Sequence, residues 1–524
     1  MSLKRATILL MFLALMSRFL GVGREMAVAS EFGVSAESDA FFIAYSIPFA
    51  FYSIVGVSLT AVIVPMLADF DASGNTERGL AVASSAINIV LIFSALIAAL
   101  GMVFSDQIAQ FMGGSFPSET LHLTSRLIAI ILPSIVCMSI AGIISGILNN
   151  YKVYAAPATG PVIMNAVAIG SMIFTSTFGI EAPVIGVLAG SVFYVLYQIP
   201  SLSKIGFKYR FAIIREANIL TKLISSVWSV MAVSICYFSY NLTDYKIASG
   251  LNEGSIAALT YATRFIQVPQ GLFTLAVTTA IFPSLSAYAA RGEHANVRNM
   301  LEKGIRAILL LAVPTSAVLL VIGNSIMMVL FQHGKFDADA TAMATNTLAY
   351  LTIGLVGFSL NLPLIRCFYS LNMHRVPLLI LLGSIPIKIL LSSVLSGVMD
   401  GSGLALATSA TYSINAAVMV LFLRRHLTGL LGLEFGIFTL RLVATSACMV
   451  AVVFFVDKGL GNVMPETHLA TFARIAISCC VAGLAYVGFG LVFAMNELSV
   501  PVKTVWWRSA KALSREVRKL RGIS

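Results

Sequence analysis

The sequence predicts an all-α protein that crosses a membrane many times, and three observations lead to this fold class. The chain has 524 residues, of which 58% are hydrophobic and only 11% charged, whereas soluble domains carry roughly 25% charged residues. Its mean hydropathy is +0.92. The apolar residues gather in runs of about twenty, the length that a helix needs to cross a bilayer. Although the net charge is +11, this composition excludes a soluble nucleic-acid-binding protein.

About fourteen transmembrane helices are expected from the apolar runs. Their ranges are 6–30, 40–67, 79–103, 123–148, 157–176, 182–203, 217–241, 254–288, 303–326, 342–368, 374–396, 402–424, 436–457 and 469–495. The eighth segment is longer than one span requires. We therefore expect it to tilt, to kink near Pro269 or to project into the cytosol.

The distribution of lysine and arginine predicts that both termini lie in the cytoplasm, because basic loops stay on that side. One set of alternate loops contains Arg78, Lys152, Lys204, Lys208, Arg210, Arg215, Arg291, Arg298, Lys303, Arg375, Arg424 and Arg425. The other set has few basic residues and holds the acids Glu31, Glu37, Asp39, Asp106, Asp244, Asp337 and Asp457. Residues 501–524 are expected to form a basic amphipathic cytoplasmic tail, which either lies as a helix along the anionic membrane surface or only fixes the topology by its charge.

Two short motifs recur half a chain apart. V-P-M-L-A-D-F at 64–70 matches F-P-S-L-S-A-Y at 282–288, and L-N-N-Y-K at 148–152 matches L-N-M-H-R at 371–375. Six helices per repeat is an even number, so the halves share one topology. They should form two parallel six-helix repeats around a central cavity, with two further C-terminal helices. The expected divisions are an N-terminal lobe (1–210), a C-terminal lobe (211–428), two extra helices (429–500) and the tail.

Three arginines fall inside expected spans: Arg18 and Arg24 in the first, and Arg264 in the eighth. Each would cost roughly 2.5–3.5 kcal/mol at the bilayer centre, so three would cost about 8–10 kcal/mol, comparable with the stability of a whole protein. They cannot face lipid. The alternatives are a polar, water-filled cavity and a buried ion pair.

Glu25 lies seven residues after Arg18 and therefore on the same helix face. The two side chains are too far apart for direct contact, but both could line one wall of the cavity. Gly21 and Gly23 lie between them and would allow a bend or a close helix approach.

Three further polar residues are candidates for the same site. Asp39 could pair with an arginine or bind a cation, or it could be an ordinary loop acid. Asn165 could line the cavity or bond a neighbouring backbone. Lys388 lies deep in the eleventh span and is a second-tier candidate.

The sequence contains no catalytic motif. All six cysteines lie in apolar runs, where they act as small packing residues, and none has the spacing of metal ligands. There is no nucleotide-binding loop and no nucleophile motif. We therefore expect a non-enzymatic protein without a cofactor, in which any transport is secondary and not driven by ATP.

Several stretches resemble one known family. S-R-F-L-G-V-G-R-E at 17–25, S-D-A-F-F-I-A-Y-S-I-P at 38–48, L-F-Q-H-G-K-F at 330–336 and the Arg264 segment that ends in F-P-S-L-S are similar to the MurJ/MviN lipid II flippases. That family belongs to the MOP (MATE-like) exporter superfamily. The resemblance covers nearly the whole chain.

This resemblance implies a function and roles for several residues. Arg18, Arg24 and Arg264 would bind the diphosphate of an anionic polyprenyl lipid, Asp39 would be functionally important, and the last two helices would hold the lipid tail. The protein would work by alternating access in the bacterial inner membrane, coupled to the membrane potential or to a monovalent cation. We expect a monomer in contact with membrane lipids.

The second span departs from the family pattern. Family members typically carry an arginine pair and a Glu-Gly dipeptide there, whereas residues 49–60 are uncharged. Export of another polyprenyl-linked glycan, such as an O-antigen or exopolysaccharide unit, is therefore the alternative. A drug or cation antiporter would need acidic cavity residues. A non-transporting scaffold would tolerate alanine at all three arginines.

Overall fold

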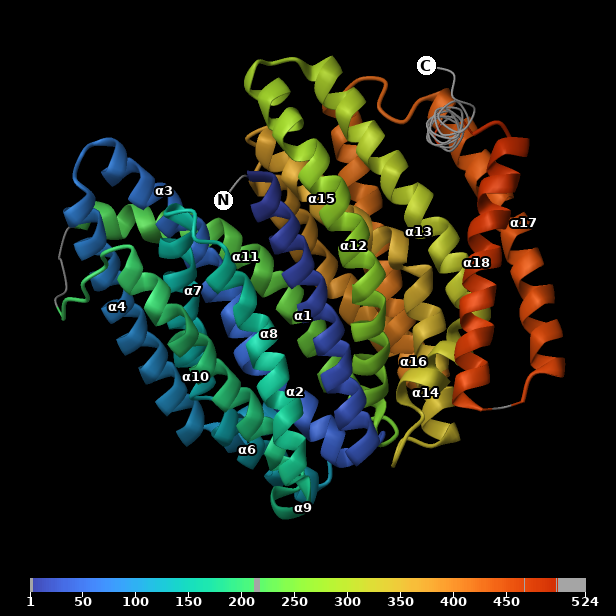
Figure 1. Ribbon diagram of the computed structural model, residues 1–524, viewed down its shortest axis with the longest axis horizontal. Helices are drawn as coiled ribbons and strands as arrows, with labels where there is room; N and C mark the ends of the chain where they lie inside the picture. Colours follow the sequence, from blue (N-terminus) through green and yellow to red (C-terminus); the bar gives the residue numbers. More distant parts are fainter. Residues whose placement is uncertain (1–2, 212–216, 466, 496, 498–524) are drawn as a thin grey trace, which may run out of the picture. The chain divides into compact units, whose positions relative to one another are not determined.

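The computed structural model describes residues 3–211, 217–465, 467–495 and 497, and these residues form helices and connecting turns without any strand (Figure 1). The prediction of an all-α fold is confirmed. The expected tail helix at 501–524 lies outside the described residues.

Between residues 3 and 204 the chain forms ten α-helices, with one π-helical turn and one 3₁₀ turn between them. They are α1 (Leu3–Phe32), α2 (Ala36–Phe51), the π-helical turn Tyr52–Gly56, α3 (Val57–Ala72), α4 (Thr76–Val103), α5 (Ser105–Gly113), α6 (Ser118–Ile131), α7 (Ser134–Asn150), α8 (Ala155–Gly170), the 3₁₀ turn Ser171–Phe174, α9 (Thr175–Phe178) and α10 (Glu181–Lys204).

The remaining helices are longer on average. They are α11 (Ala217–Ala248), α12 (Ser255–Ala290), α13 (His294–Phe331), α14 (Ala338–Ile353), α15 (Leu355–Ser370), α16 (Arg375–His426), α17 (Leu433–Val463) and α18 (His468–Val492). Each expected span corresponds to one of these helices or to consecutive helical elements, and no expected span extends more than three residues beyond them.

Among the described residues, ten helices are long and apolar enough to cross a membrane, or eleven if the bent pair α14 and α15 forms one span. Helix α16 has 52 residues and contains a break at Asp400, where φ is 50° and ψ is −139°. Because about twenty residues cross a bilayer, its two arms correspond to two expected spans. Helices α1 and α11 correspond to the two remaining expected spans, so the helices are consistent with fourteen spans.

The second span is interrupted by a turn of π-helix at Tyr52–Gly56, which follows Pro48 in α2. At this point α3 and α7 come very close. A Cβ atom at Gly142 would lie 2.9 Å from the backbone of Gly56, so the approach requires a glycine. The Thr60 hydroxyl donates to the carbonyl oxygens of Gly142 (2.8 Å) and Gly56 (3.0 Å) and joins the two helices.

The repeated motif at 64–70 and 282–288 is followed by the same turn. Gly74 lies in the α3–α4 connection with φ of 73°, and Gly292 lies in the α12–α13 connection with φ of 71°. Each glycine lies ten residues after the first residue of its motif. Neither has a neighbour that would collide with a side chain. Both are therefore needed for their left-handed backbone, which supports the internal repeat.

The chain divides into two compact units. The first comprises Met1–Val268, Leu330–Gly354 and Asn372–Asn415, and the second comprises Pro269–Val329, Leu355–Leu371 and Ala416–Ser524. The lobes expected at 1–210 and 211–428 remain a prediction. In the first unit, Ile63, Leu67, Ile143 and Ile147 belong to an apolar core shared by α3, α4 and α7.

Candidate functional site

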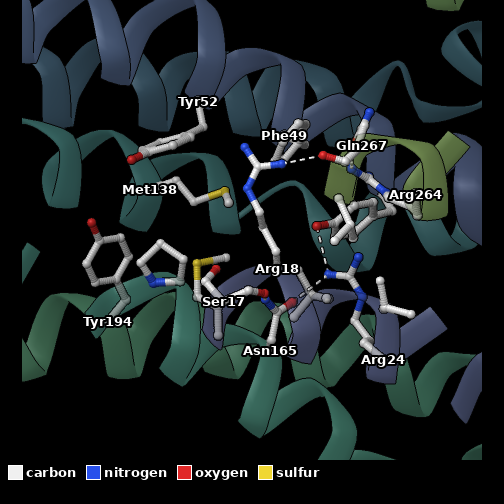
Figure 2. Close-up of a pocket in the computed structure, with 17 residues that line it drawn as sticks. Ser17, Arg18, Arg24, Phe49, Tyr52, Met138, Asn165, Tyr194, Arg264 and Gln267 are labelled. Atoms are coloured by element: carbon white, nitrogen blue, oxygen red, sulfur yellow. Dashed lines mark hydrogen bonds between the residues drawn. The ribbon is translucent and has the colours of Figure 1, made fainter. Parts of the chain in front are cut away.

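The first unit contains a cavity of about 310 Å³ whose walls come from α1, α2, the π-helical turn, α7, α8, α10 and α12 (Figure 2). Four of the predicted site residues line it: Arg18, Arg24, Asn165 and Arg264. Cavities of this size are at the lower end of those that bind small molecules. The polar site expected around the arginines is therefore a defined pocket.

Glu25 lies behind the wall of the cavity and joins two of the arginines. Its side chain is fully buried, and its Oε1 atom is 2.6 Å from Nη2 of Arg24 and 3.4 Å from Nε of Arg264. The sequence predicted a shared face with Arg18, but the contacts of Glu25 are with the other two arginines. This arrangement combines the two expected alternatives, because a buried ion pair forms part of a polar cavity.

The Arg24 guanidinium contacts three other side chains, those of Glu25, Tyr45 and Asn165. Its Nη1 donates to the Tyr45 hydroxyl (2.7 Å) and to Oδ1 of Asn165 (3.2 Å), and its guanidinium lies 4.2 Å from the centre of the Tyr45 ring. Asn165 in turn donates from Nδ2 to the carbonyl oxygen of Ser17 (3.1 Å). Asn165 therefore links α8 to α1 at two points and orients the arginine.

Arg18 is the most accessible of the three arginines. Its residue is exposed, whereas Arg24 is 4% exposed and the Arg264 side chain is 23% exposed. Its Nη1 donates to the carbonyl oxygen of Gln267 (2.5 Å), while Arg264 donates to the side-chain oxygen of the same glutamine (3.3 Å). Within the described residues, Arg18 has no carboxylate partner.

The cluster therefore carries an excess of positive charge. Three guanidinium groups and the single Glu25 carboxylate leave a net charge of +2 beside the cavity. Guanidinium groups bind phosphate and carboxylate oxygens through paired hydrogen bonds. The site can hold an anion of about two charges without leaving a buried charge uncompensated.

Gly21 and Gly23 are not needed for helix packing at this site. A Cβ atom at Gly21 would lie 3.8 Å from Nδ2 of Asn165, and one at Gly23 would lie 3.8 Å from Cδ1 of Ile169. Both are ordinary contact distances. The close helix approach that we expected from the sequence therefore does not depend on these glycines.

Asp39 does not line the cavity and caps a helix. Its Oδ2 accepts a hydrogen bond from the Gly254 backbone N–H (2.9 Å), and its Oδ1 accepts one from that of Ala257 (2.7 Å). The residue is 1% exposed. A carboxylate at a helix N-terminus is favoured by the unsatisfied N–H groups and by the helix dipole. Asp39 thus fastens α2 to the start of α12.

Lys388 is also outside the cavity lining. It is fully buried, and its Nζ lies 2.5 Å from both Oδ1 of Asp244 and Oγ1 of Thr408. Thr408 also donates to Oδ2 of Asp244 (3.1 Å). The lysine therefore belongs to a closed ion pair between α11 and the two arms of α16.

Six of the seven acids that we expected in loops lie within helices, all except Asp337, and two of them form ion pairs with another helix. Asp244 is in α11 and pairs with Lys388, and Asp457 is in α17 and pairs with Arg474 of α18 at 2.8 and 2.7 Å. Each tolerates burial because a basic residue on another helix neutralises it. The expectation of loop acids was wrong at all six positions.

The aromatic part of the cavity was missed by sequence reasoning. Tyr45, Phe49, Tyr52 and Tyr194 all line the pocket. The first three recur at intervals of four and three residues, the spacing of one helix face. This regular spacing was the available signal, but in an apolar chain it is also the pattern of ordinary packing.

Across the described ranges, no group of three or more His, Cys, Asp or Glu residues could hold a metal ion.

Comparisons with known proteins agree on one family. The family model described as "Lipid II flippase MurJ" matches residues 28–496. A relative from Buchnera aphidicola, named "Probable lipid II flippase MurJ", is 27% identical over 521 residues, covering 97% of this chain and 100% of the relative. The "Lipid II flippase MurJ" of Burkholderia cenocepacia is 28% identical over 438 residues, covering 81% and 84%.

Solved structures share the fold. The structure titled "Lipid II flippase MurJ, inward closed conformation" superposes with a TM-score of 0.79 at 24% identity, covering 94% of this chain and 100% of that chain. A MATE-family multidrug transporter of the MOP superfamily in an inward-facing conformation superposes with a TM-score of 0.66 at 15% identity, covering 81% and 98%.

Proposed function

The chain belongs to the MurJ family of lipid II flippases, and we propose that it moves lipid II from the inner to the outer leaflet of the bacterial cytoplasmic membrane by alternating access. Lipid II is a polyprenyl lipid whose diphosphate carries a peptidoglycan building block. The proposal rests on the family match and on one physical observation, the match of charge between the cavity and a diphosphate.

The net charge of +2 beside the cavity suits a diphosphate with about two negative charges. Arg18 is the accessible contact for the phosphates, and Arg264 is the second, because Glu25 only partly neutralises it at 3.4 Å. Arg24 is already bound to Tyr45, Asn165 and Glu25. Its role in the proposal is to position the wall from which Arg18 reaches the cargo.

The remaining expectations extend this proposal. Both termini would lie in the cytoplasm, as the basic loops favour. Exposed apolar residues of α17 and α18, such as Leu440, Phe455 and Leu484, would contact the lipid tail. The working unit in this proposal is a monomer.

The membrane potential is the proposed energy source. A charge that crosses the full field gains about 2.3 kcal/mol per 100 mV. The loaded site would be close to neutral, while the empty site would carry about two positive charges. A cytosol-negative potential would therefore draw the empty site back inward with about 4–5 kcal/mol per 100 mV.

Complementation of a strain that lacks its own lipid II flippase tests the proposal. We expect the chain to restore growth and to restore lipid II accessibility at the outer leaflet. The variant in which Arg18, Arg24 and Arg264 are all alanine should fail at normal expression. Unchanged lipid II accessibility with the intact chain, or full rescue by the triple variant, would refute the proposal.

A further inference from the structure

We propose that Tyr52, Met138 and Tyr194 form a subsite for the first sugar ring of the cargo, next to the phosphate-binding arginines. This inference rests on the proposed function, because it assumes a sugar diphosphate as the ligand. It adds a second recognition element to the same cavity and assigns it to the saccharide.

The cavity has two chemically different ends. Figure 2 shows Arg18 in the middle, with Arg24 and Arg264 on one side and Tyr52, Met138 and Tyr194 on the other. The second end contains no charged group among its described lining residues. Its surface consists of aromatic rings and a thioether. Phosphates therefore fit only the first end, and an uncharged part of the ligand fits the second.

The uncharged end has a rigid floor. Tyr194 is 2% exposed, Met138 is 4% exposed, and the Tyr194 hydroxyl is bound to Ser145 (3.2 Å) and to the Pro157 carbonyl (3.3 Å). The Tyr194 ring lies so close to Gly160 that a methyl group there would overlap it. This ring therefore keeps one orientation, as a stacking surface requires.

Tyr52 is presented by an unusual piece of backbone. It is the first residue of the π-helical turn, and its ring packs against Gly56, where a Cβ atom would lie 2.7 Å from the ring. Single π-helical turns within helices occur frequently at functional sites. Tyr52 is only half-buried, so its ring remains available to a ligand.

The order of the bonded groups in a lipid-linked sugar decides which part of the ligand occupies the uncharged end of the cavity. The sugar is bonded to one phosphate and the prenyl chain to the other. When the phosphates contact Arg18, the first sugar lies directly beside the arginines. A long prenyl chain exceeds a cavity of about 310 Å³ and must leave it, so it cannot end on the buried floor. A pyranose is compact, and the C–H bonds of its flatter face pack against the negative face of an aromatic ring.

Binding measurements with two probes test this subsite. The probes are undecaprenyl diphosphate and the same lipid carrying one N-acetylhexosamine, each titrated against the purified full chain. Tyr52→Leu keeps apolar volume but removes the ring. We expect it to weaken binding of the sugar-bearing probe about three- to tenfold and to leave the sugar-free probe unchanged. Tyr52→Phe, the matched control, should bind both as the unchanged protein does.

The outcomes separate this inference from the proposed function. Equal weakening of both probes by Tyr52→Leu, or weakening of neither, overturns the sugar subsite. Equal affinity of the unchanged protein for the two probes also overturns it, and this comparison does not depend on any variant folding. Arg18→Gln should weaken both probes. If neither weakens, the diphosphate site itself is refuted, whatever Tyr52 does.

Discussion

The two charged clusters of the first unit differ in how completely their charges are compensated. The arginine cluster has three guanidinium groups and one carboxylate beside an open cavity. The Lys388–Asp244 pair is a one-to-one match with no exposed surface on the lysine. Both are costly charges within apolar helices. Excess positive charge next to a cavity is what the proposed anion site requires, whereas a completed pair holds helices together.

The largest effect is expected from breaking the completed pair. Lys388→Met would leave the buried Asp244 carboxylate without its cation and destabilise the protein by about 3–5 kcal/mol. A large fall in the melting temperature of the purified protein would show this. The double variant Asp244→Asn with Lys388→Met should recover most of the loss. If the double variant is as unstable as the single one, the pair is not the unit that we describe.

A substitution in the arginine cluster should weaken ligand binding and leave the stability of the protein unchanged. Arg18→Gln would remove a charge-assisted contact to the diphosphate worth about 1.5–3 kcal/mol, or roughly ten- to 150-fold in affinity. Its melting temperature should stay near that of the unchanged protein, because no described carboxylate loses a partner. A binding titration and a melting curve on the same sample test both statements. A marked loss of stability would mean that Arg18 is structural.

Asp39 lies between these extremes, since it is buried but compensated by backbone N–H groups. Asp39→Ala would leave the N–H groups of Gly254 and Ala257 without their acceptor and cost about 1–2 kcal/mol. Hydrogen exchange at these two amides should accelerate. Glu37→Ala, an exposed acid in the first turn of the same helix, is the control and should leave exchange unchanged.

The smallest effect is expected at Gly21 in the arginine wall. Gly21→Ala meets only ordinary contacts inside a helix and should stabilise the protein slightly, by less than about 1 kcal/mol. Gly33→Ala is the contrasting control, because Gly33 has φ of +65° and a Cβ atom would lie 2.6 Å from the Lys335 carbonyl oxygen. That variant should lose about 1–2 kcal/mol. Similar melting temperatures for the two variants would contradict the geometry.

Most of the fold could be predicted from the sequence, because apolar runs of fixed length specify membrane helices almost by themselves. The breaks within the spans could not be predicted in this way. The π-helical turn at Tyr52–Gly56 accompanies the contact between Gly56 and Gly142, two residues far apart in the chain. Periodicity along one segment contains no information about such a partner.

The sequence predicted which buried residues are charged, but not which of them form ion pairs with each other. The cost of burial identified Arg18, Arg24 and Arg264, and all three line one cavity. That same cost also identified Lys388, which lies elsewhere. Its partner Asp244 comes from another helix, so only the three-dimensional structure separates the lysine from the cavity arginines. The aromatic lining was hidden for a different reason, since aromatic residues are common in apolar helices.

The contact of Arg24 with its immediate neighbour Glu25 has a consequence for how the protein is made. Both residues belong to α1, so this pair can form once the first helix has left the ribosome, before Arg264 is synthesised. The first helix can thus enter the membrane with part of its charge already neutralised. Asp244 has no such neighbour, and its ammonium partner arrives 144 residues later. The Arg24–Glu25 contact can therefore form early, while the Lys388–Asp244 pair must wait until about three quarters of the chain has been synthesised.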